Sequence, residues 1–241
     1  MNLNGKTYLV TGAARRVGRE LALAIGRADG NVVVHHSQSP REANEVVGEV
    51  QRMGQKAWAL QADFSAPRQA LGLIEAAWRL APLDGLVNNA AIFEPLNWQD
   101  SSLEAWQRHL DINLTAPFLL CQGFARLLPA EKDGRIVNIL DWRALRPGAD
   151  HLPYTVSKAG LAALTRSLAE GLAPRIAVNG IALGAILPPA DGADSAGVLA
   201  QVPARRWAKM DEVTDTLLFL LGGPGYITGE VIHVDGGRHI I

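Results

Sequence analysis

Tyr154 and Lys158 offer a phenol and an ammonium group, which together can transfer a proton. They stand four positions apart in the run Tyr-Thr-Val-Ser-Lys, and this spacing places both side chains on one face of a helix. An ammonium close to a phenol favours the phenolate and lowers the pKa of the phenol, which makes it a usable proton donor or acceptor near neutral pH. The pair predicts a proton-transfer site, provided that other functional residues accompany it.

A glycine turn follows the first strand-like run and predicts a phosphate-binding loop. Gly12 and Gly18 enclose Arg15, Arg16 and Val17 where the strand pattern gives way to a helical one. Such a turn lets the backbone approach a pyrophosphate, which the first N–H groups of the helix and its dipole stabilise. Arg16 stands where a glycine is expected, and a cation at a helix N-terminus is unfavourable unless an anion meets it. A turn that serves only to pack the strand against the helix is the alternative.

The end of the second strand-like run indicates the coenzyme. Residues 35–39 read His-His-Ser-Gln-Ser, and no acidic residue stands between Asp29 and Glu42. An NAD-binding site uses an acid here to accept the ribose hydroxyls, whereas a 2′-phosphate repels that acid and favours cations and hydroxyl donors. With Ser37 and Ser39 as the hydroxyl donors, the run predicts NADPH as the cofactor.

The distribution of charge agrees with an anionic ligand. The chain carries 23 basic and 24 acidic side chains, a net charge of −1, but residues 1–41 alone carry a net charge of +4. The balanced total excludes a uniformly basic nucleic-acid binder. The local excess falls largely on the two segments expected to meet phosphates, so we expect a small-molecule partner and no nucleic acid.

These residues must be positioned by alternating strands and helices. Strand-like runs are predicted at 6–11, 31–36, 56–61, 84–88, 134–140, 176–183 and 230–234. Helical patterns are predicted at 16–28, 40–53, 66–80, 102–128, 154–173 and 211–221. This alternation is typical of βαβ units around a parallel sheet, and 241 residues without a linker fit one domain. We predict a single α/β domain over residues 1–241, a Rossmann-type doubly wound fold with a seven-stranded parallel sheet and helices on both faces. Ligands of such folds bind beyond the carboxyl ends of the strands.

Several segments bound the remaining possibilities. Residues 185–210 are the least regular part of the chain, and we predict that they form a lid over the substrate. Cys121 is the only cysteine, which excludes an internal disulfide and a cysteine-based metal cluster, and we expect no metal. The N-terminal residues lack the apolar stretch of a signal peptide, and no segment reaches the roughly 20 apolar residues of a membrane span. We therefore expect a cytoplasmic protein that is not inserted in a membrane.

The order of the remaining motifs resembles the short-chain dehydrogenase/reductase family over essentially the full length of the chain. The positions that carry the resemblance are Thr11-Gly12, Asp63, Asn88-Asn89-Ala90, Asn113, Tyr154 and Lys158, Gly184, Ile227-Thr228-Gly229 and Val234-Asp235-Gly236-Gly237. The resemblance implies that Asp63 meets the adenine, that Lys158 also holds the nicotinamide ribose, and that Asn113 ties a proton-relay water to the site. It further implies a homotetramer and the cofactor contacts Asn89, Ala90, Ala91, Tyr154, Gly184 and Ile186.

Asp141 departs from the common family pattern, because most members carry a catalytic serine at this position, thirteen residues before the tyrosine. An aspartate here, together with Arg16 in place of a glycine, resembles the pteridine reductases. Phe93 matches the aromatic residue that stacks on the pterin in that subgroup, and Ser39 matches its phosphate-contacting serine. The resemblance implies an NADPH-dependent reductase of a pterin-type C=N bond. Tyr154 would be the proton donor, Asp141 would reprotonate it, and both would contact the substrate together with Phe93 and Arg16.

Two other functions remain open. The first is a carbonyl or alcohol oxidoreductase that acts on a 3-oxoacyl thioester, a sugar or a steroid; an ionised Asp141 disfavours it, because a carboxylate only accepts hydrogen bonds and repels a developing oxyanion. The second is a dinucleotide-sensing scaffold without catalysis, which the intact Asn113, Tyr154 and Lys158 disfavour. Asp141 as a simple turn residue and Phe93 as loop packing are the structural alternatives.

Overall fold

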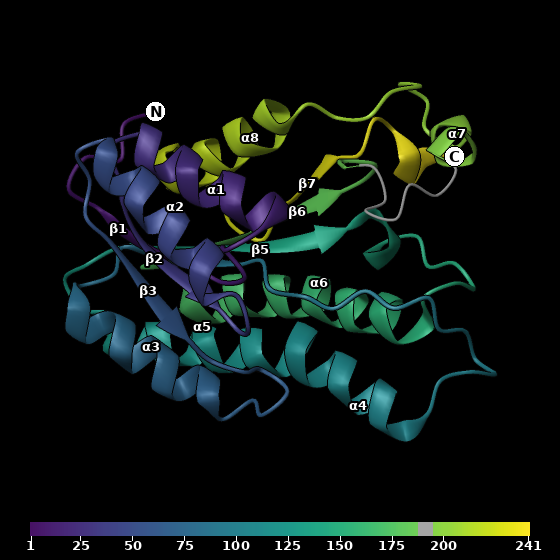
Figure 1. Ribbon diagram of the computed structural model, residues 1–241, viewed down its shortest axis with the longest axis horizontal. Coiled ribbons are helices and arrows are strands. Elements are labelled where there is room, and N and C mark those ends of the chain that lie inside the picture. Colours follow the sequence, from purple (N-terminus) through teal and green to yellow (C-terminus); the bar gives the residue numbers. More distant parts are fainter. Residues whose placement is uncertain (188–194) are drawn as a thin grey trace.

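Seven parallel strands form one sheet in the computed structural model, which describes residues 1–187 and 195–241 (Figure 1). The strands are β1 (Thr7–Val10), β2 (Asn31–His36), β3 (Ala57–Gln61), β4 (Gly85–Asn88), β5 (Gly134–Asp141), β6 (Ile176–Leu183) and β7 (Val231–Val234). They pair in the order β3-β2-β1-β4-β5-β6-β7, every pair parallel. The predicted fold class and all seven predicted strands are therefore confirmed.

The strands are apolar on both faces because helices cover both faces. In β1, Val10 belongs to one buried cluster and Leu9 to another, and in β2 Val32 and Val33 divide between the clusters in the same way. Successive side chains of a strand point to opposite faces, so each strand supplies both cores at once. This explains why the strands read as runs of valine, leucine and isoleucine and not as apolar–polar alternation.

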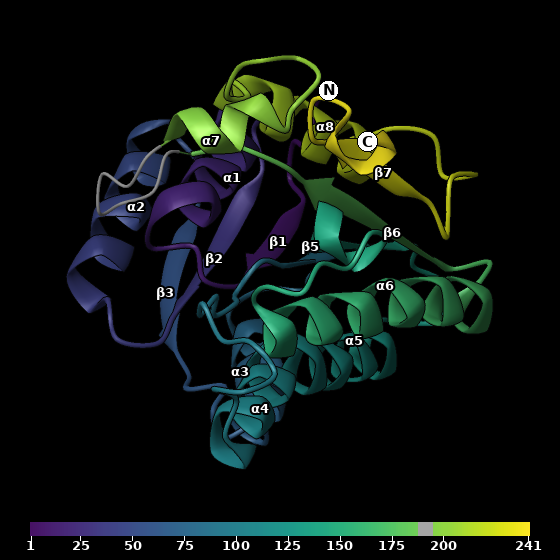
Figure 2. The same ribbon diagram turned by 90° about the vertical axis from the view of Figure 1, so that its right-hand side faces the viewer.

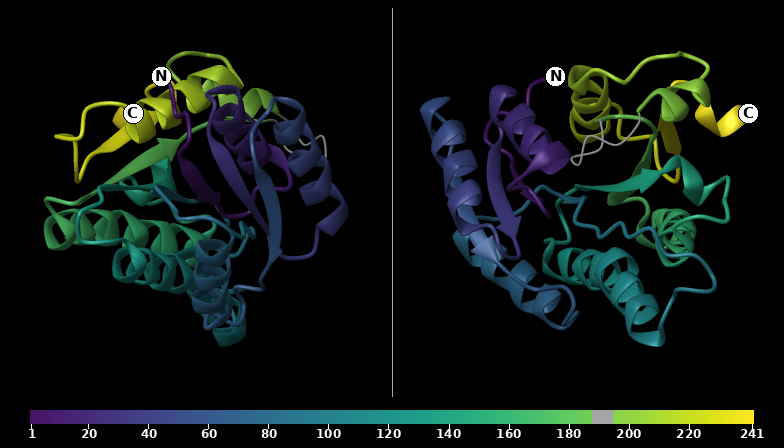
Figure 3. Two further views of the ribbon diagram at one scale, coloured as in Figure 1. Left: turned by 90° about the vertical axis from the view of Figure 1, so that its left-hand side faces the viewer. Right: turned by 45° about the vertical axis from the view of Figure 1, so that its right-hand side comes forward.

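The helices form two layers, one on each face of the sheet (Figures 1 and 2). One layer contains α1 (Arg16–Arg27), α2 (Pro40–Arg52) and α8 (Met210–Gly222). The other contains α3 (Gln69–Leu80), α4 (Leu103–Leu110), α5 (Ala116–Leu127) and α6 (Leu152–Leu172) (Figure 3). None of the described helices is both long and apolar enough to span a membrane.

Two details differ from the predicted elements. The segment predicted as one helix over 102–128 is helical throughout, but a π-helical turn at Asp111–Thr115 separates α4 from α5. A helix, α7 (Ser195–Ala200), lies inside the segment predicted as an irregular lid, and residues 188–194 of that segment are outside the described residues. Hydrophobic periodicity does not detect one extra residue in a turn, nor a helix of six residues.

The chain reverses direction across the sheet between β1 and β4. The connection after β1 leads to β2 and β3 on one side, whereas β4 begins the series that continues through β5, β6 and β7 on the other. Loops leaving neighbouring carboxyl ends diverge at such a point, and ligands of open α/β sheets bind there. The glycine turn follows β1 and the Asn88-Asn89-Ala90 run follows β4, so the fold brings both to the reversal point.

A chain of buried hydrogen bonds anchors α6 to the middle of the sheet. Asn88 Nδ2 donates to Asn138 Oδ1 over 2.8 Å, and Asn138 Nδ2 donates to Thr165 Oγ1 over 2.8 Å. Asn138 and Thr165 are fully buried. Buried polar groups that keep their partners specify one arrangement of the elements that carry them. The network therefore determines where α6, with Tyr154 and Lys158, lies along β5.

Replacement of Asn138 by alanine should destabilise the fold by about 2–4 kcal/mol, because it removes two buried hydrogen bonds. Asn88 Nδ2 would keep only its contact with Cys121 Sγ, and Thr165 Oγ1 would keep only its bond to the Leu161 carbonyl oxygen. Chemical denaturation followed by circular dichroism measures the change. Asn4→Ala, in the exposed N-terminal segment, is the matched control and should alter stability little. An Asn138→Ala protein as stable as the control would show that the network does not anchor α6.

Candidate functional site

The glycine turn after β1 opens onto a cavity of about 490 Å³ at the reversal point of the sheet. Gly12 adopts φ +62° and Arg16 adopts φ +51°, the left-handed region that favours glycine. Arg16 therefore occupies a glycine-type backbone position, as its place in the sequence suggests, at a steric cost of roughly 1–2 kcal/mol. Residues predicted for the cofactor that line this cavity are Gly12, Arg15, Arg16, Val17, Gly18, Ser37, Asp63, Asn89, Ala90, Ala91 and Tyr154.

His35 fixes the glycine turn, a role that sequence reasoning missed. Its Nδ1 accepts the Gly12 N–H over 3.1 Å and its Nε2 contacts the Ala62 carbonyl oxygen at 3.1 Å. Burial lowers the pKa of His35 to about 4, so the neutral ring serves as acceptor at one nitrogen and donor at the other. Its ring also stacks on Phe64 with the centroids 4.4 Å apart. The only signal in the sequence, a histidine at a strand end, is also what an ordinary strand would show.

The loops after β1 and β4 are joined directly. Thr11 Oγ1 accepts the backbone N–H groups of Asn89 and Ala90 over 2.9 and 3.0 Å. Asn89 Nδ2 donates to the carbonyl oxygens of Thr11 and Gly12 over 2.9 and 3.2 Å. A Cβ on Gly12 would lie 2.9 Å from the Ala90 Cα, so the approach of the two loops requires glycine there. The two walls of the cavity are thus held as one unit.

A smaller hollow of about 310 Å³ lies beside the end of β2. It is lined by Gly12, Ala14, Arg15, His36, Ser37, Gln38 and Ser39, so it joins the glycine turn to the predicted coenzyme-selecting run. Among the residues that the structure describes, no carboxylate belongs to its lining. Ser37 lines both hollows, whereas Ser39 lines only this one.

The positive charge of residues 1–41 is less available than the sequence suggests. Arg15 forms an ion pair with Glu42, and Arg19 forms ion pairs with Glu20 and Glu49. Arg41 likewise pairs with Glu45 on the next turn of α2. Arg16 makes no ion pair among the described residues and lines the larger cavity. A net charge counted over residues 1–41 leaves out Glu42 and Glu49, which lie on α2 and pair with these arginines in the folded chain.

Tyr154 and Asp141 meet at the carboxyl end of β5. The Tyr154 hydroxyl donates to Asp141 Oδ2 over 3.2 Å, and the Arg143 backbone N–H donates to Asp141 Oδ1 over 2.9 Å. Burial raises the pKa of Asp141, although the Arg143 N–H and the charges of Arg143 and Lys158 partly offset the rise. The structure thus brings together the two residues that the thirteen-residue spacing relates.

The predicted effect of Lys158 on Tyr154 does not hold in this structure. Lys158 Nζ lies 5.8 Å from the centre of the Tyr154 ring and donates to the Ile139 carbonyl oxygen over 2.7 Å. Burial, reinforced by the negative charge of Asp141, raises the pKa of Tyr154 well above its ordinary value. Burial also lowers the pKa of Lys158 to about 8. Spacing on a helix places the two side chains on one face but does not reveal how deeply that face is buried.

Asn113 lies in the π-helical turn and binds two segments of the site. Its Oδ1 accepts the Ile92 N–H over 2.9 Å and its Nδ2 donates to Ser157 Oγ over 3.0 Å. Ser157 Oγ in turn donates to the Tyr154 carbonyl oxygen over 2.7 Å. Asn113 is therefore connected to Tyr154 through Ser157, a link that sequence reasoning missed. π turns often occur at functional sites, because the extra residue turns one side chain out of the regular helical ladder.

Phe93 stands next to Tyr154 with half of its side chain exposed. Its ring meets the Tyr154 ring edge-on, with the centroids 4.6 Å apart, and His151 stacks on it at 3.9 Å. Arg143 Cζ lies 5.6 Å from the Phe93 ring centre and 4.7 Å from the Trp142 ring centre. Phe93 therefore lies beside Tyr154, and its contact with substrate stays a prediction.

Four predicted cofactor contacts lie outside the lining of the large cavity: Ser39, Lys158, Gly184 and Ile186. Gly184 donates its N–H to the Val234 carbonyl over 3.0 Å, and a Cβ there would lie 2.5 Å from the Asp235 Cα, so it permits close packing of β6 on the chain after β7. Ile186 is buried in the core under α8. Among the described residues, no group of three or more His, Cys, Asp or Glu is placed to hold a metal ion.

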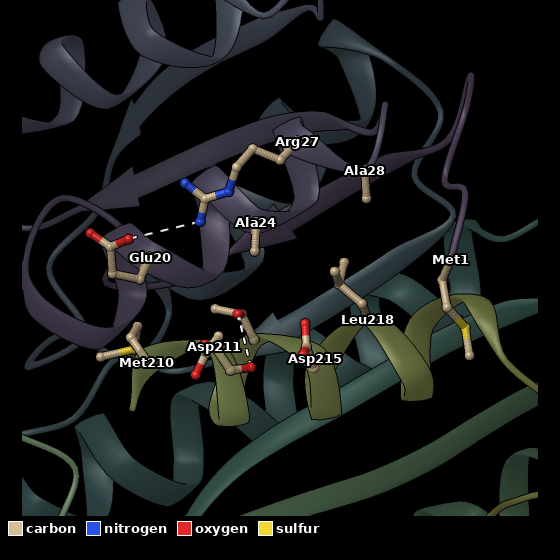
Figure 4. A pocket seen from close by; sticks show the side chains of 10 residues that line it. Met1, Glu20, Ala24, Arg27, Ala28, Met210, Asp211, Asp215 and Leu218 are labelled. Atoms are coloured by element: carbon tan, nitrogen blue, oxygen red, sulfur yellow. Dashed lines mark hydrogen bonds and ion pairs between the residues drawn. The ribbon is translucent and has the colours of Figure 1, made fainter. Parts of the chain in front are cut away.

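Another hollow of about 480 Å³ lies between α1 and α8 (Figure 4). Its lining includes Glu20, Arg27, Asp211 and Asp215, and Arg27 Nη2 lies 3.9 Å from Glu20 Oε2. None of the residues singled out in the sequence lines it, and it does not lie at the reversal point of the strands. The candidate site is therefore the cavity beside Tyr154.

The chain matches the family described as short chain dehydrogenase over residues 6–197. A 3-oxoacyl-[acyl-carrier-protein] reductase of Synechocystis sp. is 34% identical to it over 240 residues, which cover 98% of this chain and 97% of that protein. The 3-oxoacyl-[acyl-carrier-protein] reductase FabG of Aquifex aeolicus is also 34% identical, over 250 residues and 98% of each chain.

Solved structures agree over the same length. FolM alternative dihydrofolate reductase 1 from Brucella canis, complexed with NADP, superimposes with a TM-score of 0.93 at 31% identity, covering 99% of this chain and 96% of that one. A blue fluorescent protein from a metagenomic library, in complex with NADPH, gives a TM-score of 0.92 at 33% identity and covers 99% of both chains. Fold, site and similarity together define an oxidoreductase of the doubly wound class. The chain belongs to the short-chain dehydrogenase family.

Asp141→Asn should stabilise the protein at pH 7 and raise its unfolding temperature. The folded-state pKa of Asp141 lies above the unfolded value, so the ionised carboxylate opposes folding. This cost is absent below the unfolded pKa of about 4 and grows as the pH rises through the folded value. Calorimetry from pH 4 to pH 8 should show the gain increasing with pH.

Asp150→Asn is the matched control with the opposite sign. A hydrogen bond from Arg143 lowers the pKa of Asp150 to about 2, so its carboxylate supports folding above the unfolded pKa and loses that effect as the pH falls toward about 2. The variant should therefore be less stable than the parent at pH 7. A fall in stability of Asp141→Asn at pH 7 would contradict the burial argument.

Proposed function

We propose that the protein is an NADPH-dependent reductase that transfers hydride to a C=N bond of a planar, pterin-type heterocycle, with Tyr154 as the proton donor. The observation that carries the proposal is the hydrogen bond between Tyr154 and a buried Asp141, 3.2 Å long, beside the half-exposed ring of Phe93. The similarity to a FolM alternative dihydrofolate reductase supports the same substrate class.

The two hollows fit NADPH by the chemistry of their linings. The larger one begins at the glycine turn and the N-terminus of α1, where backbone N–H groups and Arg16 can meet a pyrophosphate. The smaller one offers the hydroxyls of Ser37 and Ser39 to a 2′-phosphate, and none of the described residues that line it is acidic. Arg15 also lines it, although its guanidinium is paired with Glu42. Asp63 is available to an adenine, and Asn89, Ala90 and Ala91 form the opposite wall. The NADP and NADPH complexes of similar chains support this assignment.

Bound NADPH supplies the hydride to the carbon of the C=N bond. Tyr154 donates its hydroxyl proton to the neighbouring nitrogen, and Asp141 replaces it across the hydrogen bond that the two side chains share. The raised pKa of Asp141 favours the protonated carboxyl that this replacement needs. Lys158 holds positive charge close to the phenol ring and is available to the nicotinamide ribose. Asn113 reaches the Tyr154 carbonyl oxygen through Ser157 and is the residue proposed to hold the proton-relay water.

The position of Asp141 favours C=N over C=O reduction. A carbonyl develops negative charge on oxygen, and an oxyanion needs hydrogen-bond donors in place before the reaction. Asp141 Oδ1 and Oδ2 both accept hydrogen bonds in the structure, from the Arg143 N–H and the Tyr154 hydroxyl. An imine-type nitrogen instead requires a proton, which the same pair can deliver.

Reduction of a 3-oxoacyl thioester is the second candidate, because the curated relatives described above are named for it. The substitution Asp141→Ser distinguishes the two, since a serine hydroxyl can donate to an oxyanion. A thioester reductase should tolerate this change, whereas a pterin reductase should lose turnover.

Tyr154→Phe and Asp141→Ala should each reduce turnover of a dihydropterin by orders of magnitude, with little change in NADPH binding, since the first removes the proton and the second its replacement. NADPH absorbance is followed with dihydropterins, dihydrofolate and a 3-oxoacyl thioester in parallel, and NADH serves as the coenzyme control. Near-parental turnover by Asp141→Ala, or activity confined to the thioester, would refute the pterin assignment.

Ser37→Asp should lower kcat/KM for NADPH about tenfold or more and raise the relative use of NADH. The added carboxylate would repel a 2′-phosphate and accept hydrogen bonds from ribose hydroxyls. Ser102→Asp is the control, because it adds the same charge at the N-cap of α4, where aspartate also caps a helix. It should leave kcat/KM unchanged for both NADPH and NADH. If Ser37→Asp kept the parent's preference for NADPH over NADH, the 2′-phosphate would not bind in this hollow.

The resemblance to the family also supports a cytoplasmic homotetramer, and the irregular segment at 185–210 is proposed as the substrate lid. Within that segment the described residues are tied to the C-terminal end of the chain by hydrogen bonds from Arg238 Nη2 to Gln201 Oε1 over 2.9 Å and from the Ala204 N–H to the Gly236 carbonyl oxygen over 3.0 Å. Arg238 also lies over Trp142, which follows Asp141, with its Cζ 4.2 Å from the ring centre.

A further inference from the structure

We infer that His151 is a specificity-determining residue of the substrate site, because its ring occupies the face of Phe93 on which a planar substrate would stack. This inference rests on the proposed function, and it names the side chain that the substrate must displace. A planar heterocycle enters only if it stacks on Phe93 more favourably than the imidazole does.

The geometry of the pair is that of a bound aromatic ligand. The rings of Phe93 and His151 are nearly parallel, with an angle of 8° between them, and their centroids are 3.9 Å apart. An imidazole is a planar nitrogen heterocycle, as is each ring of a pterin. The Tyr154 ring lies nearly perpendicular to the same Phe93 ring, at 79° with the centroids 4.6 Å apart, so a ring that replaced His151 would lie near the Tyr154–Asp141 pair.

The side chain of His151 is held by a short chain of charged groups. Its Nδ1 lies 3.0 Å from Asp150 Oδ2, and the same oxygen accepts a hydrogen bond of 2.7 Å from Arg143 Nη2. Arg143 is nearly buried and stacks over Trp142, which immobilises the group that holds Asp150. These polar contacts favour the stacked Phe93–His151 pair, although no covalent bond or core packing holds the imidazole there.

The backbone of His151 is fixed independently of its ring. The residue adopts φ +53°, and its carbonyl oxygen accepts the Thr155 N–H over 2.8 Å to begin α6. The next residue, Leu152, donates its N–H to the Leu96 carbonyl over 2.7 Å. The ring can therefore leave Phe93 by rotation about its own side-chain bonds, while Tyr154 keeps its position on α6.

Selectivity follows from the exchange of one stack for another. A bicyclic heterocycle covers more of the Phe93 ring than an imidazole and gains from the replacement. A smaller single-ring ligand gains less, so the imidazole discriminates among planar ligands by the stacking area that they offer. A flexible acyl chain does not compete for this face of Phe93 and is not affected by the imidazole. Half of the Phe93 side chain remains exposed beside the imidazole, so the stacked ring is accessible from solvent.

The test replaces the ring of His151 and leaves its backbone in place. Asparagine adopts the left-handed conformation readily and can still donate to Asp150, so His151→Asn removes only the stack. His239→Asn is the matched control: His239 also stacks on a ring, His233 at 3.8 Å, and also contacts an aspartate, Asp235 at 2.8 Å, but it lies in the C-terminal turn. Thermal unfolding of both variants verifies that they fold.

Calorimetry measures the Kd of a dihydropterin for the complex of each protein with NADP⁺. His151→Asn should bind it about two- to tenfold more tightly than the parent, the factor that one aromatic pair supplies, and His239→Asn should match the parent. The KM of a 3-oxoacyl thioester should not change. Equal or weaker dihydropterin binding by folded His151→Asn would overturn the inference, and so would absence of binding to both proteins.

The readout separates the two hypotheses. Binding is measured without turnover, so a parent protein that binds a dihydropterin but reduces only the thioester would refute the proposed function and leave the effect of His151 measurable. Binding that appears only in His151→Asn would support the inference, because the imidazole would then be what excludes the planar ring.

Discussion

The hydrogen bond between Tyr154 and Asp141 is the contact on which the arrangement of the site depends. It joins the end of β5 to the first turn of α6, and the Asn138–Thr165 hydrogen bond joins the same strand and helix farther along. Burial raises the pKa of both groups, so each favours its protonated form. In the proposed reaction this pair would hold the proton that the substrate takes, at the cost of some stability at neutral pH.

Two residues beside the site adopt backbone conformations that suit glycine. Arg16 begins α1 with φ +51° and His151 precedes α6 with φ +53°. Such strain persists only where the surroundings determine it, and it gathers at functional sites. In both cases the strained backbone places a side chain at the site: the cation of Arg16 lines the larger cavity, and the ring of His151 covers Phe93.

Much of the fold could be predicted because its signals are local. The valine run at 32–34 and the apolar runs like it indicate strands covered on both faces, and the longer patterns between them indicate helices. The π turn at Asp111–Thr115 could not be predicted, because one added residue hardly alters the apolar pattern of a long helix. The charge excess of residues 1–41 was overestimated as free charge, because the acids of α2 that neutralise Arg15 and Arg19 follow later in the chain.

The sequence is enough to predict the doubly wound sheet, the glycine turn, and the spacing that relates Asp141, Tyr154 and Lys158, because each depends on residues close together or on strand order. The folded structure was needed to show that His35 holds the glycine turn and that His151 covers Phe93. It also decided that the pKa of Tyr154 rises when spacing alone predicted a fall. The physical reason is the same in each case: desolvation and ring contacts depend on which distant segments pack together, and a linear pattern does not contain that information.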